Sequence, residues 1–196
     1  FVTTWYDQSG NANDAVQPTT TAQPKIVSAG ALVVGGLDFD GVDDSMSTQV
    51  NVSIPQPFTS IHVSNPDVIG TDPVVAQGVN KDTNWNWGDF YSSSSFTGIN
   101  AGASVTGGAY SIATDYLKFS VINNGASSIS LNGSVVSGLT AGTSVGTDKI
   151  LIGAAKASGF LFVLDGQISE IILYASDQSA NRVAIEANIN AAYSIF

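Results

Sequence analysis

The chain has 196 residues and no cysteine, and sixteen acidic residues against six basic ones give it a formal net charge of -10. Without cysteine and with a single histidine, the chain cannot form disulfides or the usual zinc sites. The negative charge disfavours nucleic acid as a partner, and no apolar run reaches the roughly 20 residues that membrane insertion of a helix needs. The 20 glycines, with 43% hydrophobic and 11% charged residues, favour one all-β domain over residues 1–196.

A polar loop follows the first predicted strand, which covers residues 1–6, where β-branched and aromatic side chains alternate. The loop offers carboxylate, amide and carbonyl oxygens within about eight residues, and calcium prefers six to eight oxygen ligands. We therefore treat five loop residues as candidate calcium ligands: Asp7, Gly10, Asn11, Asn13 and Asp14. A network of Asx turns without an ion accounts for the same residues.

The segment from Leu37 to Met46 combines a short strand with a turn. Phe39 lies between two aspartates and should point inward, and Asp40-Gly41 is a turn signal. Asp43 and Asp44 either cap this turn or supply a second cation site, and turn chemistry favours capping.

The strand predicted over residues 58–63 carries the only histidine of the chain. His62 alternates with Ile61 and Val63, so it lies on the opposite face, either exposed or lining the concave sheet. A catalytic histidine needs a positioned partner, and no nearby aspartate has a recognisable spacing from His62. A structural role is therefore favoured.

Residues 80–91 are rich in aromatic side chains interleaved with polar ones. Aromatic rings stack on the C–H faces of sugars, while amides and carboxylates bind their hydroxyls. The candidate carbohydrate-binding residues are Asn84, Trp85, Asn86, Trp87, Asp89, Phe90 and Tyr91. Alternatively, Trp85 and Trp87, two positions apart on one face of a strand, fill the core.

The last third of the chain holds the clearest local signals. Asn132-Gly133 lies between two apolar runs and predicts a hairpin with a type I′ turn. Residues 168–174 have few polar positions, which predicts a central strand. Residues 180–194 are the one convincing helix, with Val183 on its apolar side and Glu186 on its outer side.

Three of these motifs together resemble the laminin-G-like, concanavalin-A-like jelly-roll domains of bacterial and phage surface proteins. They are Trp5-Tyr6-Asp7-Gln8-Ser9-Gly10-Asn11-Ala12-Asn13-Asp14-Ala15, Leu37-Asp38-Phe39-Asp40-Gly41-Val42-Asp43-Asp44, and the strand Asp165-Gly166-Gln167-Ile168-Ser169-Glu170 that precedes the helix. The resemblance implies a two-sheet antiparallel jelly-roll β-sandwich with a C-terminal helix, and a structural calcium site near the Asp7 loop. The family commonly has Asp where this chain has Ser169; if that Asp is a cation ligand, its loss weakens the calcium prediction unless Asp165 takes its place.

The function expected from these patterns is a non-catalytic carbohydrate-recognition or adhesion module of an extracellular, cell-surface or virion-surface protein. Its partner would be a glycan or polysaccharide surface, and a homo-oligomer or a larger parent assembly stays open. The main alternative is a purely structural spike, fibre or decoration domain. A jelly-roll glycoside hydrolase or lyase is disfavoured because the two glutamates form no recognisable pair, which leaves Asp89 and Asp115 as the acids available to an enzyme.

Overall fold

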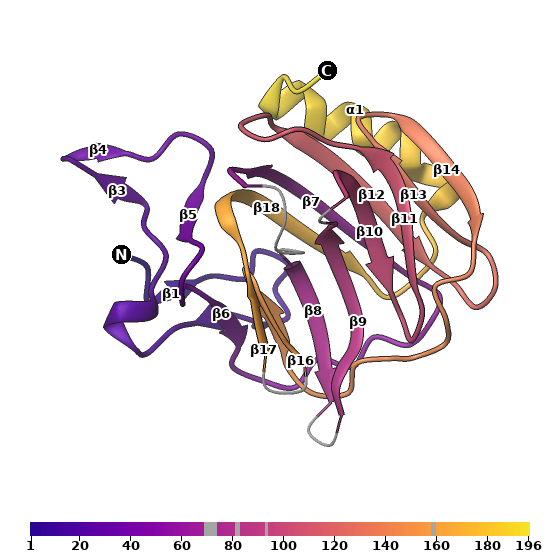
Figure 1. The fold of residues 1–196 in the computed structure, drawn as a ribbon, viewed down its shortest axis with the longest axis horizontal. Coiled ribbons are helices and arrows are strands. Elements are labelled where there is room, and N and C mark those ends of the chain that lie inside the picture. Colours follow the sequence, from indigo (N-terminus) through magenta and orange to yellow (C-terminus); the bar gives the residue numbers. More distant parts are fainter. Residues whose placement is uncertain (69–73, 81–82, 93, 158–159) are drawn as a thin grey trace.

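The computed structural model describes residues 1–68, 74–80, 83–92, 94–157 and 160–196. Two antiparallel sheets pack face to face (Figure 1). In hydrogen-bonding order, the first sheet consists of β1 (Thr4–Trp5), β2 (Ala15–Val16), β6 (Met46–Thr48), β15 (Ile150–Ile152), β8 (Val74–Asn80), β9 (Thr83–Tyr91), β10 (Phe96–Asn100) and β11 (Ser104–Ala109). The second consists of β14 (Ser134–Leu139), β13 (Ser127–Leu131), β12 (Tyr116–Ile122), β7 (Phe58–Pro66), β18 (Asp165–Tyr174) and β5 (Leu37–Asp40). The predicted antiparallel β-sandwich is confirmed.

The main core lies between the two sheets. Its largest fully buried side chains are Trp87, Tyr91, Phe39 and Phe58. Phe39 points inward as predicted, because its neighbours Asp38 and Asp40 alternate onto the other face of β5. Among the described residues, no helix is long and apolar enough to cross a membrane.

Helix α1 (Arg182–Tyr193) covers the outer face of the second sheet (Figure 1). Its Ile185 and Ile189 pack against apolar side chains of β7 and β12. The predicted sides of the helix are wrong at two positions, since Glu186 is 4% exposed and Val183 is 68% exposed. Glu186 is buried because it pairs with Arg182, whose guanidinium also reaches the Ser130 hydroxyl on the sheet at 3.4 Å.

Two hairpins and two 3-10 helices complete the fold. Hairpin β3 (Val27–Ser28) and β4 (Ala31–Leu32) projects from the sandwich, and hairpin β16 (Ala154–Ala157) and β17 (Phe160–Val163) lies on the outer face of the first sheet (Figure 1). The 3-10 helices are η1 (Thr20–Ala22) and η2 (Ser179–Asn181).

The turn between β13 and β14 is the predicted two-residue hairpin. Asn132 and Gly133 have φ angles of +47° and +80°, as a type I′ turn requires, and Leu131 pairs with Ser134.

Strand β18 is central over only part of its length. Its first residues pair with β5 on one side and β7 on the other, whereas Glu170–Tyr174 pair with β7 alone in the described part of the chain. The reason is that β5 is only four residues long. This open edge of β18 forms one side of a cleft.

Candidate functional site

A cleft of about 670 Å³ lies between the N-terminal loop and the open edge of β18. Side chains at the border of the core form its apolar floor: Ala15, Val52, Ile54, Ile150, Ile152, Ile171 and Leu173. Aromatic rings also line it: Trp5, Tyr6 and Tyr193. Its polar lining includes Asp7, Gln8, Ser9, Asn11, Asn13, Thr48, Ser53, Ser169 and Glu170. An apolar floor with a few polar groups at this volume is typical of a small-ligand site.

The aromatic side chains of the cleft differ in their exposure. The Tyr6 side chain is 66% exposed, so its ring is accessible to a ligand, while Trp5 is half-buried and packs against the core. On the opposite side, Tyr193 lies beside Glu170, and burial followed by this carboxylate raises the pKa of Tyr193. Strand β1 positions Trp5 by pairing with Ala15 of β2, and the chain leaves the sheet directly afterwards. The predicted strand over residues 1–6 is therefore shorter than expected.

The Asp7 loop is held by its own hydrogen bonds. The Asp7 carboxylate accepts hydrogen bonds from the backbone N–H of Asn13 at 2.9 Å and that of Ser9 at 2.8 Å, and from the Ser9 hydroxyl at 2.8 Å. These bonds, the one from Asn13 foremost, lower the pKa of Asp7. Asp14 Oδ1 in turn accepts the Asp7 N–H at 2.8 Å. The Asx-turn alternative therefore accounts for the shape of the loop, in which Gly10 adopts a φ of +83° and the Asn11 amide contacts Ser9.

The structure does not bring Asp165 to the Asp7 loop, so this part of the predicted ligand set is wrong. Asp165 pairs with Asp40 across β18 and β5, where Asp67 and Asp38 also act on it electrostatically. Burial, followed by these charges, raises its pKa. The spacing of residues along the chain does not indicate at which end of the sandwich β18 begins, and so it could not show that Asp165 lies away from the Asp7 loop.

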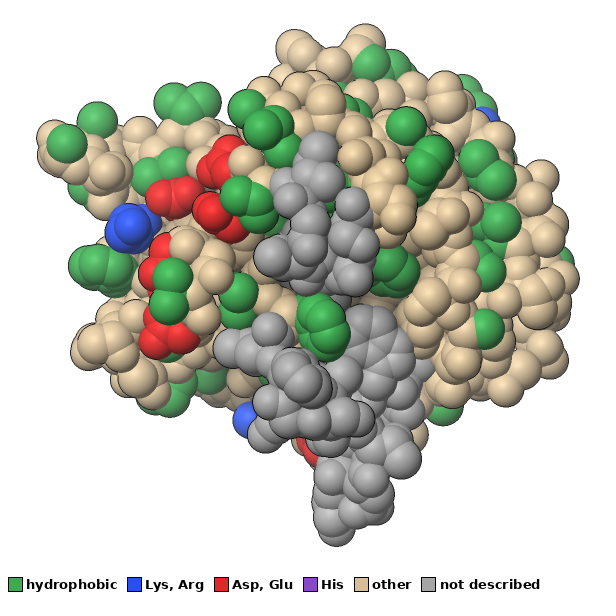
Figure 2. All heavy atoms as spheres, viewed as in Figure 1, with side chains coloured by type: hydrophobic (Ala, Val, Ile, Leu, Met, Phe, Trp, Pro, Cys, Tyr) green, Lys and Arg blue, Asp and Glu red, His purple; other side chains and the backbone are tan. Residues whose placement is uncertain are grey.

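Acidic side chains gather on one side of the molecule, around the Asp40-Gly41 turn (Figure 2). Asp40 Oδ1 accepts the backbone N–H groups of Val42, Asp43 and Asp44, and Asp44 Oδ2 accepts the N–H of Asp40 at 3.2 Å. The predicted capping role is thus confirmed for Asp44. In the described part of the chain, Asp40, Asp43 and Asp44 are the one group of three acidic or histidine side chains with ligand atoms within 4.8 Å of one another.

The predicted aromatic binding surface is wrong for four of its seven residues. Trp87, Asp89 and Tyr91 are 0% exposed because they point between the sheets, and Phe90 is 7% exposed because β16 and β17 cover it with Ala155 and Phe162. A ring with no exposed surface cannot stack on a sugar. The side chains of Asn84, Trp85 and Asn86 lie outside the described residues.

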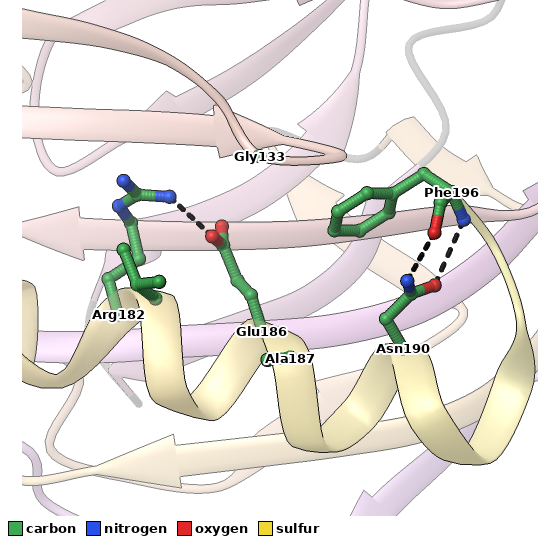
Figure 3. Close-up of a pocket in the computed structure, with 7 residues that line it drawn as sticks. Gly133, Arg182, Glu186, Ala187, Asn190 and Phe196 are labelled. Atoms are coloured by element: carbon green, nitrogen blue, oxygen red, sulfur yellow. Dashed lines mark hydrogen bonds and ion pairs between the residues drawn. The ribbon is translucent and has the colours of Figure 1, made fainter.

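A smaller cavity of about 300 Å³ lies between α1 and the β13–β14 turn. Figure 3 shows the Phe196 ring pointing toward Gly133, with the Arg182–Glu186 pair farther along the helix. Asn190 Oδ1 accepts the backbone N–H groups of Ile195 at 2.7 Å and Phe196 at 2.9 Å, and its Nδ2 donates to the Phe196 carbonyl. These polar groups serve to fasten the last residues to the helix.

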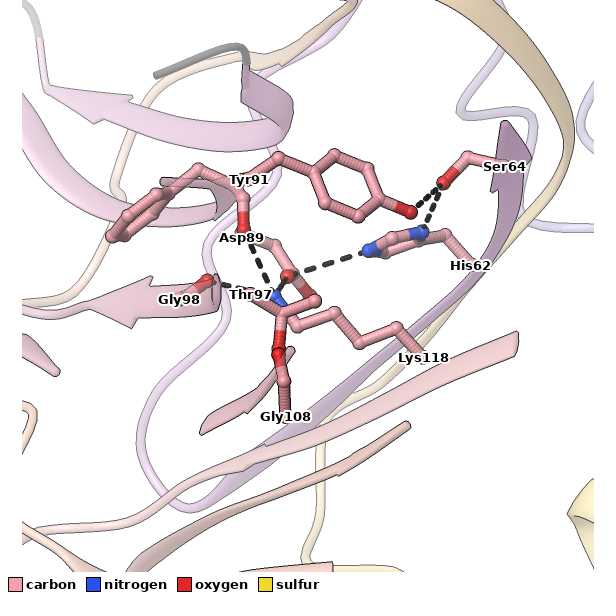
Figure 4. A network of polar contacts seen from close by, with 9 residues as sticks. His62, Ser64, Asp89, Tyr91, Thr97, Gly98, Gly108 and Lys118 are labelled. Atoms are coloured by element: carbon pink, nitrogen blue, oxygen red, sulfur yellow. Dashed lines mark hydrogen bonds and ion pairs between the residues drawn. The ribbon is translucent and has the colours of Figure 1, made fainter. Parts of the chain in front are cut away.

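A buried polar network joins the two sheets (Figure 4). His62 Nδ1 lies 2.8 Å from Ser64 Oγ, which lies 2.8 Å from the Tyr91 hydroxyl, and His62 Nε2 lies 3.4 Å from Asp89 Oδ1. Lys118 contacts the same carboxylate oxygen and donates to the Gly98 carbonyl at 2.7 Å. All five side chains of the network are at most 1% exposed. The Ser64–His62–Asp89 order is that of a hydrolase triad, but no substrate can reach it.

The network explains three pKa shifts. Burial lowers the pKa of His62 and of Lys118, which favours their uncharged forms. Burial alone would raise the pKa of Asp89, but the nearby Lys118 and His62 lower it overall. His62 does line the inner face of its sheet, opposite Ile61 and Val63, and Asp89 is the partner that sequence spacing missed.

Comparison with known proteins finds solved structures that are similar to this β-sandwich. No protein-family model matches the chain, and neither does any curated protein. Trypanosoma rangeli sialidase in complex with sialic acid matches with a TM-score of 0.65 and 15% identity, over 94% of this chain and 30% of the sialidase. A SAP-like pentraxin from Limulus polyphemus matches with a TM-score of 0.59 and 11% identity, over 75% of this chain and 78% of that protein. The CBM40 module of Ruminococcus gnavus IT-sialidase, bound to α2,3-sialyllactose, matches with a TM-score of 0.55 and 10% identity, over 78% of this chain and 99% of the module.

The likeness is one of fold. The three proteins share a β-sandwich of jelly-roll type with this chain, and the chain spans less than a third of the sialidase. The structure also separates the two acids considered for an enzyme, because Asp89 is buried between the sheets whereas Asp115 is exposed and accepts a hydrogen bond from Asn65 at 3.1 Å. Asp89 and Asp115 therefore do not form a pair of acids in one accessible site.

Proposed function

We propose that this protein is a non-catalytic carbohydrate-recognition module that binds neutral glycans in the cleft between the Asp7 loop and β18. The observation that carries this proposal is the exposed Tyr6 ring beside amide and carboxylate side chains, above an apolar floor. A sugar needs such a surface, since its C–H face stacks on a ring while planar polar groups bind its hydroxyls. Two of the similar structures contain sialic acid or sialyllactose, which supports a glycan as the class of ligand.

The charges that line the cleft favour an uncharged sugar. Its described lining contains Asp7 and Glu170 but no lysine, arginine or histidine. A sialic acid carboxylate needs a cation or several donors, and here it would meet two carboxylates on a chain of formal charge -10. The ligand we propose is therefore a neutral hexose or N-acetylhexosamine chain at the surface of a cell, a virion or a secreted polysaccharide.

The test is a glycan array that includes matched neutral and sialylated chains, probed with wild type, Tyr6→Ala and Phe96→Ala. Phe96 is 42% exposed and lies on β10, outside the cleft, so its variant controls for the loss of an exposed ring. We expect wild type and Phe96→Ala to bind neutral glycans and Tyr6→Ala to lose most of that binding. Loss in both variants, or binding to no glycan, would remove the proposal.

A structural surface domain is the second candidate, and one observation favours it. Leu32 and Val34, on and next to the projecting hairpin β3–β4, are 72% and 91% exposed, and Val27, which pairs with Leu32, is 46% exposed. Exposed apolar residues gathered in this way are typical of contacts within an assembly. If this candidate is right, light scattering shows an oligomer that a Leu32→Ser/Val34→Ser variant disrupts, and the glycan array stays blank.

A further inference from the structure

The contact between Lys118 and Asp89 joins the two sheets of the sandwich. Lys118 is on β12 of the second sheet and Asp89 is on β9 of the first, and both side chains are 0% exposed. The Lys118 amine also donates to the Phe90 carbonyl at 3.3 Å and the Gly98 carbonyl at 2.7 Å. These two carbonyls hold Nζ against the Asp89 carboxylate from the side of the first sheet.

Burying an ion pair between the two sheets is energetically unfavourable. Moving both charges out of water carries a desolvation penalty that their attraction repays only if every remaining polar atom is bonded. Asp89 Oδ2 is buried and has no hydrogen-bond partner among the described residues. An unpartnered carboxylate oxygen costs more than an unpartnered amide oxygen, because it carries part of a full charge.

We propose that Lys118 and Asp89 condense in the folded protein to an isopeptide bond between β12 and β9. The Lys118 Nζ–Asp89 Cγ bond forms and the Cγ–Oδ1 bond breaks. Of the three protons of the ammonium group, two leave with Oδ1 as one molecule of water and the third stays on the amide nitrogen, so atoms and charge balance without an oxidant or co-reactant. The remaining N–H donates to the Gly98 carbonyl, and Oδ2 becomes the amide oxygen.

The fold supplies the two conditions that condensation needs. It holds nucleophile and carboxyl group in contact, which replaces a bimolecular encounter by a step within one molecule, and it excludes water, which otherwise reverses the reaction. Burial also lowers the pKa of Lys118, so more of the amine carries the free electron pair that attacks.

His62 is placed to assist the departure of the leaving oxygen. Its Nε2 lies 3.4 Å from Oδ1, the oxygen that leaves, and Lys118 is its direct neighbour in the β7–β12 register. On the other side of the ring, the Tyr91 hydroxyl donates a hydrogen bond to Ser64 Oγ, and the Ser64 hydroxyl donates one to His62 Nδ1. Because Nδ1 accepts this hydrogen bond, the proton of the neutral ring is on Nε2. His62 Nε2–H therefore donates a hydrogen bond to Oδ1 and supports its departure, while both protons of the released water come from Lys118 Nζ.

The test is the intact mass of the folded wild-type chain. We expect a mass about 18 Da, the mass of one water, below the mass calculated for the linear chain from its sequence. Trypsin should leave residues 82–149 in one piece, because an acylated Lys118 is not cleaved, and fragmentation should locate the link between Asp89 and Lys118. Lys118→Arg cannot form the amide and should show its full mass, and His62→Gln should lower the linked fraction.

One other reaction removes the same mass and must be separated from this one. The Asp40-Gly41 and Asp165-Gly166 steps can close to succinimides, which hydroxylamine opens, whereas an isopeptide bond resists it. A full mass for folded wild type, a deficit that hydroxylamine abolishes, or cleavage after Lys118 overturns the proposal. The wild-type measurement stands even if Lys118→Arg fails to fold.

Discussion

Asp44→Asn should stabilise the protein in a pH-dependent manner. Asp44 is 3% exposed, and burial, followed by the charge of Asp40, raises its pKa from 3.8 to about 6. Between these two values the folded protein keeps a proton that the unfolded chain has lost. The free energy of unfolding therefore falls as the pH rises through this window, and the contribution of Asp44 is fully present only below it.

The size of this loss follows from the pKa difference. Raising a pKa from 3.8 to about 6 corresponds to an upper limit of about 3 kcal/mol at about 1.4 kcal/mol per unit. Asp40 and Asp43 beside it are exposed, and water around them screens part of the effect, so we expect about 1–2 kcal/mol above the window. Asparagine keeps an oxygen that can accept the Asp40 N–H, and the substitution thus changes mainly the charge.

The assay is urea unfolding followed by tryptophan fluorescence, from about pH 4 to about pH 8 with a chelator present. The free energy of unfolding of Asp44→Asn should exceed that of wild type near pH 8, and the difference should vanish near pH 4. The other carboxylates titrate in both proteins, so their contributions cancel in this difference. Asp43→Asn removes an exposed charge from the same turn and should have a smaller effect. No advantage near pH 8, or an equal one near pH 4, would refute the burial argument.

Three further outcomes are expected. Trp87→Ala should cost about 3–5 kcal/mol in urea unfolding, because the buried indole packs on Phe58 at 5.0 Å between ring centroids, and a loss below about 1 kcal/mol would contradict its place in the core. Gly133→Ala should cost about 1 kcal/mol because φ is +80° there, while the added Cβ has room; an unchanged midpoint would count against the type I′ turn. We propose that the Asp7 loop binds calcium. Saturating calcium should then raise the melting temperature of wild type and of Asp43→Asn but not of Asp14→Asn. Equal shifts in all three proteins would exclude the Asp7 loop as the calcium site.

Local patterns were sufficient to locate the strand over residues 58–63, the Asn132-Gly133 turn and the C-terminal helix. Side chains of residues 58–63 alternate between two faces, and these residues lie in β7 (Phe58–Pro66) as predicted. Asn132-Gly133 specified its turn because few other dipeptides accept two positive φ angles. At the helix, spacing located the element but not its buried side, because Glu186 could be buried only with Arg182 beside it.

The candidate site could be predicted only in part from local sequence patterns. The Asp7 loop was recognised from its own residues, but the cleft also needs β18, which lies more than 150 positions further along the chain. Tyr6 was part of a predicted strand and not of a binding site, and nothing in its immediate neighbours indicated that its ring would stay exposed beside Glu170.

The sequence by itself determined which residues share a face of a strand, since side chains alternate with a period of two. It thus placed Trp87, Asp89 and Tyr91 together and His62 opposite Ile61. Only the tertiary structure decided which faces are buried, because that depends on what packs against each strand. His62, Asp89 and Lys118 meet between the sheets although 27 and 29 positions separate Asp89 from the other two, a proximity that only the packing of the two sheets creates.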